Sequence, residues 1–377
     1  MIPRFIQKQV LEALQPGRVV CLFGPRRAGK TILMEQLRDF LPEKTVQMVH
    51  GESLDVADAL SSQKTTILKR FIGRSTYLFI DEAQTIPNIG VNLKLIVDTI
   101  PTVSVLISWS STFDLRRNVG EPLVGRSRTF FLYPIAQLEC RDESYLDGQN
   151  QLESRLIHGM YPQVMIAASD EEKRKNLEAI RDGYLLKDIL MLDNLKDSLF
   201  VFNLLRLIAF QIGNDVSYNE LAANLNVNRR TVMRYLELLE QCYILFSLHG
   251  YSRNLRSEYT KTPRYYFWDT GIRNTIISNY NAIHLRDDIG KLWENYCIAE
   301  RIKMMTYRNM SMNRFFWRTY DQKEIDYVEE RGGKLYGFEC KWTREHASAP
   351  RAFRVSYPGS TFTVIHKNNY LDHLVGE

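Results

Sequence analysis

The chain has 377 residues, of which 45% are apolar and 25% charged, with a formal net charge of +5. This length exceeds one ordinary domain and the apolar content can fill real cores, so we expect two or three globular domains. The mild positive charge predicts at most local basic patches. No apolar run approaches the roughly 18 residues that a membrane-spanning helix needs, so no membrane partner is expected.

The N-terminal stretch MIPRFIQKQVLEAL has apolar residues at the spacing of an amphipathic helix. It lacks the apolar core and the cleavage site of a secretory signal, so none is expected. The five cysteines are scattered and odd in number, which fits neither a disulfide framework nor a zinc site. These features predict a cytoplasmic protein.

Residues 1–139 alternate short apolar runs with helical stretches, which predicts an α/β domain with a parallel sheet. Several of the apolar runs are nearly continuous, as in parallel strands that are buried on both faces. The expected strands are Val19–Phe23, Thr45–Val49, Tyr77–Ile80, Val103–Ser108 and Arg128–Leu132. The expected helices between them are Thr31–Leu41 and Asn92–Ile100.

The sequence GPRRAGKT fits the phosphate-binding pattern G-x-x-x-x-G-K-[ST] and lies between a predicted strand and a predicted helix. Its glycines let backbone N–H groups approach phosphate oxygens, and the positive end of the following helix favours an anion. Lys30 is expected to reach the β- and γ-phosphates, and Thr31 to hold Mg²⁺. The sequence therefore predicts ATP and Mg²⁺ as cofactors, bound by Gly24, Pro25, Arg26, Arg27, Ala28, Gly29, Lys30 and Thr31.

The sequence YLFIDEAQ is the partner of this loop, because its apolar strand delivers two carboxylates to the carboxyl end of the sheet. Asp81 is expected to join the nucleotide site and complete the Mg²⁺ shell. Glu82 is expected to polarise the attacking water. A helix cap is the alternative for a carboxylate pair after a strand, but the loop upstream favours catalysis.

Three further residues near this site carry weaker signals. Ser110 or Thr112, just past a predicted strand, is a candidate sensor of the γ-phosphate. Arg126 is a candidate arginine finger that would act on a neighbouring subunit, in a homo-oligomer formed through the ATPase domain. The alternative for each is a loop hydrogen bond or a solvated charge.

Residues 140–214 are helical and polar in pattern, with their clearest helix in DEEKRKNLEAIRDGYLLKDIL, and predict a helical lid or linker. Residues 215–284 are expected to form the next domain, which begins with a compact helical unit at about 215–248. Within this domain, YYFWD is expected to form a buried strand, although its aromatic residues could stack nucleobases. Asp269 at its end is expected to cap the following turn rather than bind a metal.

The stretch SYNELAANLNVNRRTVMRYLELLEQCYIL has the spacing of a helix-turn-helix. Asn228 is expected to cap the second helix. The core face of that helix would be formed by Val232, Tyr235, Leu236 and Leu239. Arg229, Arg230 and Arg234 lie off this face, where a recognition helix presents DNA contacts. A helical module that touches no DNA is the alternative.

The last predicted domain, residues 285–377, contains the stretch EIDYVEERGGKLYGFECKW. If Gly332-Gly333 forms a hairpin turn, Asp326 lies opposite Glu339 and Glu324 lies opposite Lys341. These four side chains would share one face, and the opposite face would be the core face.

Two carboxylates that converge at roughly 5 Å destabilise a hairpin unless a cation such as Mg²⁺ binds them. Asp326 and Glu339 are therefore candidate metal ligands. Lys341 beside them could stabilise developing charge or orient a water. The alternative is a solvated hairpin face in which Lys341 pairs with Glu324.

Taken in order, these motifs resemble prokaryotic AAA-like ATPases whose C-terminal half is a domain of unknown function related to PD-(D/E)xK nucleases. The resemblance spans almost the whole chain. It rests on FGPRRAGKT, LFIDEAQ, PLVGRSRTFFLYPI, GMYPQV, YLLKDI, YYFWDTGIRN, GKLWENYCIAE and FWRTYDQKEIDYV…FECKW. It implies an additional-strand-catalytic-glutamate ATPase, a winged helix and a C-terminal α/β restriction-endonuclease-like domain.

Nucleases of this type place an acidic residue on a first helix, an aspartate on a strand, and E-x-K on the next strand. Glu294, Asp326, Glu339 and Lys341 match these positions, so the resemblance implies catalytic roles for all four. The sensor stretch ISWSSTFDL departs from the expected pattern, with Trp109 in place of a glycine, which weakens the sensor role of Ser110.

The sequence supports two functions about equally. The first is an ATPase coupled to a metal-dependent nuclease-like domain that acts on nucleic acid, with DNA favoured. In it, ATP binding would gate access to Asp326, Glu339 and Lys341. The second is an ATP-dependent switch that binds DNA or a protein without cutting. A structural oligomer in which nucleotide serves only assembly is a third.

Overall fold

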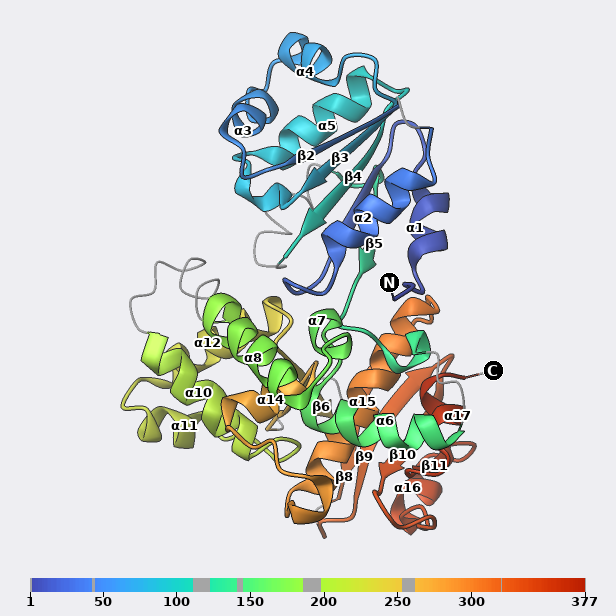
Figure 1. Ribbon diagram of the computed structural model, residues 1–377. Coiled ribbons are helices and arrows are strands. Elements are labelled where there is room, and N and C mark those ends of the chain that lie inside the picture. Colours follow the sequence, from blue (N-terminus) through green and yellow to red (C-terminus); the bar gives the residue numbers. More distant parts are fainter. Residues whose placement is uncertain are drawn as a thin grey trace. The chain divides into compact units, whose positions relative to one another are not determined.

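The computed structural model describes residues 2–42, 45–110, 123–140, 145–185, 198–252, 262–319 and 321–376. The chain forms two compact units. The first contains Met1–Pro134 and Gln241–Tyr243, and the second contains Ile135–Glu240 and Ile244–Glu377. Each unit has its own β-sheet (Figure 1).

The first unit contains a parallel five-stranded sheet in the order β2-β3-β4-β1-β5 (Figure 1). Its strands are β1 (Val19–Phe23), β2 (Val46–His50), β3 (Tyr77–Asp81), β4 (Ser104–Trp109) and β5 (Ser127–Phe131). Every residue of β1 and β4 is buried, as expected for inner strands covered on both faces. The predicted α/β class and parallel sheet are confirmed, with each strand end within one residue of its predicted place.

The helices of the first unit fall between these strands. They are α1 (Gln7–Ala13), α2 (Lys30–Asp39), α3 (Leu54–Leu60), α4 (Thr65–Ile72), α5 (Ile89–Thr99) and the short 3₁₀ helix η2 (Ala83–Thr85). Helix α2 buries Leu33, Met34 and Leu37, which recur at helical spacing. Because all the strands are parallel, the carboxyl ends of β1, β3 and β4 meet at one edge of the sheet, where such folds bind ligands.

The second unit begins with helices. They are the 3₁₀ helix η4 (Gln137–Glu139), α6 (Tyr145–His158), α7 (Pro162–Met165), α8 (Asp170–Ile180), the π-helical turn η5 (Arg181–Leu185) and α10 (Ser198–Phe210). The predicted helix in DEEKRKNLEAIRD is confirmed in α8, where Ser169 caps the N-terminus by accepting the Glu172 N–H. Residues 186–190 at the end of that predicted stretch lie outside the described ranges.

The predicted pair of helices follows as α11 (Tyr218–Asn224) and α12 (Arg229–Gln241). The Thr231 N–H donates to Asn228 Oδ1 at 2.8 Å, so the predicted cap of α12 is confirmed. The predicted core face of α12 is also confirmed, since it is buried at Val232, Tyr235, Leu236 and Leu239.

The second unit contains a mixed six-stranded sheet in the order β11-β10-β9-β8-β6-β7 (Figure 1). Its strands are β6 (Leu245–Gly250), β7 (Arg264–Phe267), β8 (Asn313–Arg318), β9 (Glu324–Arg331), β10 (Lys334–Cys340) and β11 (Thr361–Ile365). β6 pairs antiparallel with β7 and parallel with β8. Strands from residues 215–284 and from residues 285–377 therefore share one sheet.

The long helix α15 (Ile289–Tyr307) packs against β7, β10 and α17 (Tyr370–Leu374). Every residue from Leu292 to Met305 is buried, so this helix lies inside the unit. The remaining helices are α14 (Thr270–Ile276), α16 (Arg351–Ser356) and the 3₁₀ helix η6 (Ile283–Leu285). Among the described helices, none is both long and apolar enough to cross a bilayer.

Candidate functional site

The phosphate-binding loop connects β1 to α2, and its two glycines occupy positions that disfavour a side chain. A Cβ on Gly24 would lie 2.0 Å from the Leu132 carbonyl oxygen. Gly29 has a φ of 98° and caps the N-terminus of α2. The Lys30 side chain is buried, and its Nζ donates to the carbonyl oxygens of Gly24 (2.8 Å) and Pro25 (3.0 Å). The amine therefore lies within the curve of the loop.

Arg4, near the N-terminus of the chain, also holds the phosphate-binding loop in place. Arg4 donates from Nη1 to the Ala28 carbonyl oxygen at 2.6 Å and from Nη2 to the Tyr133 carbonyl oxygen at 2.7 Å. Ala28 is fully buried, whereas Arg27 is exposed and Arg26 is half-buried. The role of Arg4 could not be predicted from the sequence, because nothing in MIPRF indicates a contact with residues far along the chain.

The predicted metal-binding pair is in contact. Thr31 Oγ1 at the start of α2 donates to Asp81 Oδ2 at the end of β3, at 2.6 Å. Ser108 Oγ on β4 donates to the other oxygen, Oδ1, and Asp81 is only 3% exposed. A hydroxyl and a carboxylate placed together after the loop fit the ligand set that holds Mg²⁺ beside a nucleotide.

Glu82 follows in a tight left-handed turn with a φ of 50°. Its N–H donates to Ser108 Oγ at 2.8 Å. Its carboxylate accepts a hydrogen bond from the Gln84 amide, which also donates to Ser110 Oγ at 2.8 Å. The structure therefore brings Ser110 to Glu82 through Gln84. Ser108 and Gln84 were not predicted, although both lie inside the predicted motifs. Thr112 lies outside the described residues.

Arg126 lies at the other end of the sheet. The next residue, Ser127, pairs with Val19 at the start of β1, whereas the phosphate-binding loop follows the end of β1. Arg126 forms an ion pair with Asp98, with 2.7 Å between Nε and Oδ1. A strand of five residues separates it from the loop of its own chain by about 16 Å. Its action on a neighbouring subunit stays a prediction.

The second candidate site lies on the β9–β10 hairpin. Gly332 and Gly333 have φ values of 54° and 76°, as a two-residue type I′ turn requires. Residues pair in the predicted register from Arg331↔Lys334 to Tyr327↔Phe338. Asp326 and Glu339 come next, and Asp326 Oδ2 accepts the Cys340 N–H at 2.8 Å.

The alternative of a solvated face with a Lys341–Glu324 pair is wrong. Asp326 is only 3% exposed, because β9 is an inner strand covered on both faces. Lys341 Nζ instead binds Glu339 Oε1 at 2.7 Å. Glu324 Oε2 pairs with Arg264 Nη2 at 2.6 Å. The part of the hairpin face that carries Asp326 and Glu339 is therefore largely buried, whereas the side chains of Glu324 and Lys341 are each 38% exposed.

Glu294 on α15 belongs to the same electrostatic cluster. Burial, with the Asp326 charge as the second cause, raises the pKa of Glu294 to about 7, despite hydrogen bonds from Lys291 and Tyr266. Burial likewise raises the pKa of Asp326, and burial and Asp326 together raise that of Glu339. Burial opposes the charged form of Lys341, but Asp326 and Glu339 raise its pKa. The four residues matched by resemblance are therefore electrostatically coupled.

The raised pKa of Glu294 predicts that this residue destabilises the folded chain at neutral pH. Its folded pKa of about 7 exceeds the reference value of 4.5, so its contribution to stability is greatest below pH 4.5 and is lost as pH rises to 7. Glu294→Gln should therefore raise the unfolding free energy by about 3 kcal/mol at pH 8 and have little effect at pH 4.5. Urea unfolding at both pH values tests this; equal effects at both would contradict it.

One feature of the carboxylate cluster on β9, β10 and α15 fits a bound divalent cation. Within the described residues, Glu339 Oε2 is buried and has no hydrogen-bond partner. Mg²⁺ commonly binds one or two carboxylates and keeps several waters, so Asp326 and Glu339 would suffice. No group of three or more His, Cys, Asp or Glu residues in the described ranges is arranged to hold a metal. A metal here would therefore rely on water or backbone oxygens for its remaining ligands.

An ion-pair network connects this cluster to the helix-turn-helix. Arg264 on β7 is 3% exposed and pairs with both Asp215 (Nε to Oδ1, 3.0 Å) and Glu324. Asp215 precedes α11 and also pairs with Arg318 on β8. The network therefore ties the start of the helical module to the strand that carries Asp326. This network could not be predicted from the sequence, since its members are distant in the chain.

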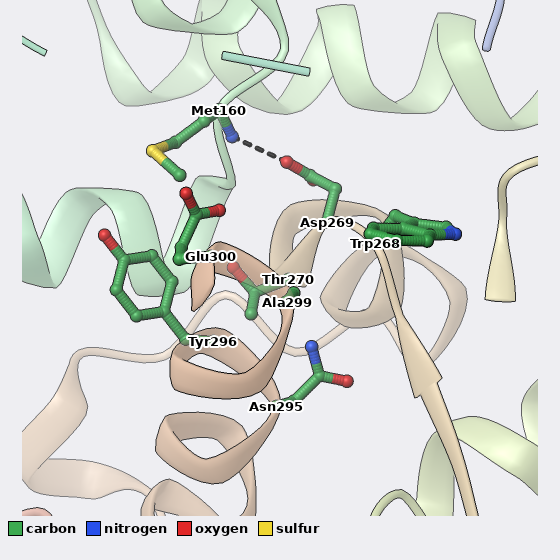
Figure 2. A pocket seen from close by; sticks show the side chains of 8 residues that line it. All are labelled: Met160, Trp268, Asp269, Thr270, Asn295, Tyr296, Ala299 and Glu300. Carbon is green, nitrogen blue, oxygen red and sulfur yellow. Dashed lines mark hydrogen bonds between the residues drawn. The ribbon is translucent and has the colours of Figure 1, made fainter. Parts of the chain in front are cut away.

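A further buried polar cluster surrounds Asp269 and Glu300 (Figure 2). Asp269 accepts the Met160 N–H at 2.7 Å and, as the predicted cap of α14, the Ile272 N–H at 3.1 Å. Glu300 accepts the Gln137 N–H at 2.6 Å and pairs with Lys303 at 2.7 Å. Both carboxylates are satisfied by the protein, so this cluster stabilises the fold.

Asp269→Ala is expected to destabilise the protein by about 2–4 kcal/mol, because two buried N–H groups lose their acceptor. Asp269→Asn keeps one acceptor oxygen and should lose less. Chemical unfolding of the full chain measures both. A loss below about 0.5 kcal/mol for the alanine variant would show that these hydrogen bonds contribute little.

Three parts of the chain match known families. Residues 16–140 match a family described as AAA domain. Residues 149–282 match Domain of unknown function (DUF8612), and residues 289–372 match Domain of unknown function (DUF4143). The first match covers the phosphate-binding loop, Asp81 and Glu82, so this part of the first unit is similar to AAA domains. The last match covers Glu294, Asp326 and Glu339, and its description assigns them no activity.

Similar proteins extend along most of the chain. An uncharacterized protein of Mycobacterium tuberculosis is 28% identical over 339 residues, which cover 88% of this chain and 72% of that protein. An uncharacterized protein of Haemophilus influenzae is 23% identical over 349 residues, covering 87% and 83%. Among solved structures, Cdc6p from Pyrobaculum aerophilum aligns with a TM-score of 0.30 and 11% identity, over 74% of this chain and 95% of that one.

Proposed function

We propose that this protein is an Mg²⁺-dependent ATPase that acts on DNA, and that its second unit is a metal-dependent nuclease. The observation that carries the ATPase part is the contact of Thr31 with Asp81 beside the buried Lys30. The nuclease part rests on the coupled carboxylates of Glu294, Asp326 and Glu339 beside Lys341.

In ATP hydrolysis, Mg²⁺ bound by Thr31 and Asp81 would neutralise charge on the phosphates. Lys30 leaves the carbonyl oxygens of the loop to bind the β- and γ-phosphates, where its charge stabilises the leaving group. Glu82 accepts a proton from the attacking water, whose oxygen bonds to the γ-phosphorus as the bond from phosphorus to the departing ADP oxygen breaks.

In the second unit, Asp326 and Glu339 would hold a divalent cation, which supplies Lewis-acid stabilisation of a phosphodiester. Lys341 then turns from Glu339 to the phosphate, where it stabilises the charge that develops on oxygen. Glu294 is well suited to accept a proton from water, since its pKa of about 7 lies near neutral pH. The water oxygen bonds to phosphorus, and the ester oxygen that leaves takes up a proton.

The partner is proposed to be DNA because α12 presents a basic surface. Arg229, Arg230 and Arg234 are exposed, while Val232 and Leu236 of the same helix are buried. A helix that is fixed by its apolar face and carries arginines on the other suits phosphate contacts in a groove.

Replacing Arg229, Arg230 and Arg234 together with glutamine should weaken duplex binding and reduce the slope of log K against log salt by about 2–3. For each phosphate contact that is lost, binding releases roughly one counterion fewer from the DNA. Fluorescence anisotropy over a salt series measures this. Arg351 and Arg354 on α16 are also exposed in the second unit, and their double replacement is the matched control. An unchanged slope in the triple variant would exclude α12 as the DNA surface.

The nuclease proposal is tested with linear, circular and single-stranded DNA in Mg²⁺ or Mn²⁺, with and without ATP. We expect metal-dependent cleavage, and a change of its rate with ATP would indicate that nucleotide gates the second site. Absence of cleavage on every substrate and metal would contradict the proposal.

A second function, an ATP-dependent switch that binds DNA or a protein without cleavage, is favoured by one observation. The described residues contain no cluster of three or more metal-ligating side chains. In that case Lys30 and Asp81 are required for function and Glu339 is not. DNA binding that responds to ATP without strand breakage would favour this switch.

A further inference from the structure

Gln84 lies on η2, directly after the two carboxylates of the ATPase site, and contacts two of its polar residues. Its Nε2 donates to Glu82 Oε2 and, at 2.8 Å, to Ser110 Oγ. An amide nitrogen has two hydrogens, and a carboxylate can only accept. Both donors of Gln84 are therefore used, and the identity of the nitrogen is fixed by its contact with Glu82.

In contrast to the nitrogen, the carbonyl oxygen of the same amide lacks a hydrogen-bond partner among the described residues. Gln84 Oε1 is buried, and no described residue donates a hydrogen bond to it. A buried acceptor without a donor costs about 1–3 kcal/mol, so a specific reason for its position is expected. The acceptor is fixed by two hydrogen bonds on the nitrogen side, next to the carboxylate that would activate water.

We propose that Gln84 is a water-positioning residue for ATP hydrolysis: once nucleotide binding uncovers the buried Oε1, this oxygen accepts a hydrogen bond from the attacking water while Nε2 orients Glu82. The inference rests on the proposed ATP hydrolysis at this site. A neutral amide cannot take the proton, which passes to Glu82, but two acceptors fix the orientation of the water before attack. Ser110 completes the arrangement, because it holds the amide from the β4 side.

The proposal predicts a specific kinetic pattern in the full chain. Gln84→Ala and the similarly long apolar variant Gln84→Met should both lower kcat about 100-fold. The affinity for ATP should stay within twofold of the wild-type value. The thermal midpoint should stay within about 2 °C of the wild-type midpoint. Ser110→Ala removes only one support of the amide, so kcat should fall less, by roughly tenfold. Single-turnover hydrolysis and calorimetric ATP binding give the two quantities separately.

Three results would each overturn the proposed role of Gln84. If wild-type protein binds ATP but does not hydrolyse it, the proposed ATPase function and this inference both fail. If the wild type is active and the Gln84 variants hydrolyse ATP within threefold of its rate, only the inference fails. If ATP affinity and thermal midpoint fall together with kcat in both variants, Gln84 has a structural role and the inference is overturned.

Discussion

Glu339→Ala is expected to abolish metal-dependent DNA cleavage, by a factor of at least 10³, while ATP hydrolysis stays within twofold. Glu339 is proposed to hold the cation, and its removal also frees Lys341 from its 2.7 Å contact. The charge that develops on the phosphodiester then has Lys341 beside it but no divalent cation. Gel assays of cleavage and phosphate release by the same preparation measure both activities.

The matched control is Glu345→Ala. Glu345 is an exposed carboxylate of the same unit, and its Oε1 accepts a hydrogen bond from Asn368. Its loss should leave cleavage unchanged. Cleavage by the Glu339 variant at the wild-type rate would contradict the nuclease proposal, and equal losses in both variants would point to misfolding.

Glu82→Gln is expected to lower ATP turnover by 10²–10⁴-fold and to leave ATP binding intact. The glutamine keeps the size of the side chain but cannot accept a proton from water. In contrast, Lys30→Ala should weaken ATP binding, because Lys30 is the cation within the loop. Comparison of the two variants separates binding from chemistry. A Glu82→Gln variant with normal turnover would show that another group activates the water.

The placement of the phosphate-binding loop beside Asp81 could be predicted because its information is local. The spacing of Gly24, Gly29 and Lys30 reflects backbone geometry within a single turn, and the apolar run before Asp81 specifies a strand end. The roles of Arg4 and Ser108 could not be predicted in this way. Their contacts with Ala28 and Asp81 depend on which strands become neighbours in the sheet.

The hairpin register was also predictable, because two adjacent glycines with positive φ fix which residues pair. The ion pairs of the hairpin were not. Arg264 comes from β7 and competes for Glu324, which leaves Lys341 to bind Glu339. The sharing of one sheet by β6, β7 and β8 is likewise a long-range pairing that alternation of apolar residues cannot reveal.

The most direct test of the account is calorimetric titration of Mn²⁺ into the nucleotide-free chain carrying Asp81→Asn, which removes the metal ligand of the ATPase site. We predict one Mn²⁺ bound per chain, and loss of this binding when Glu339→Ala is added. Binding that persists unchanged in the Glu339→Ala variant would contradict a metal site at Asp326 and Glu339, and would leave the ATP-driven binding switch as the function.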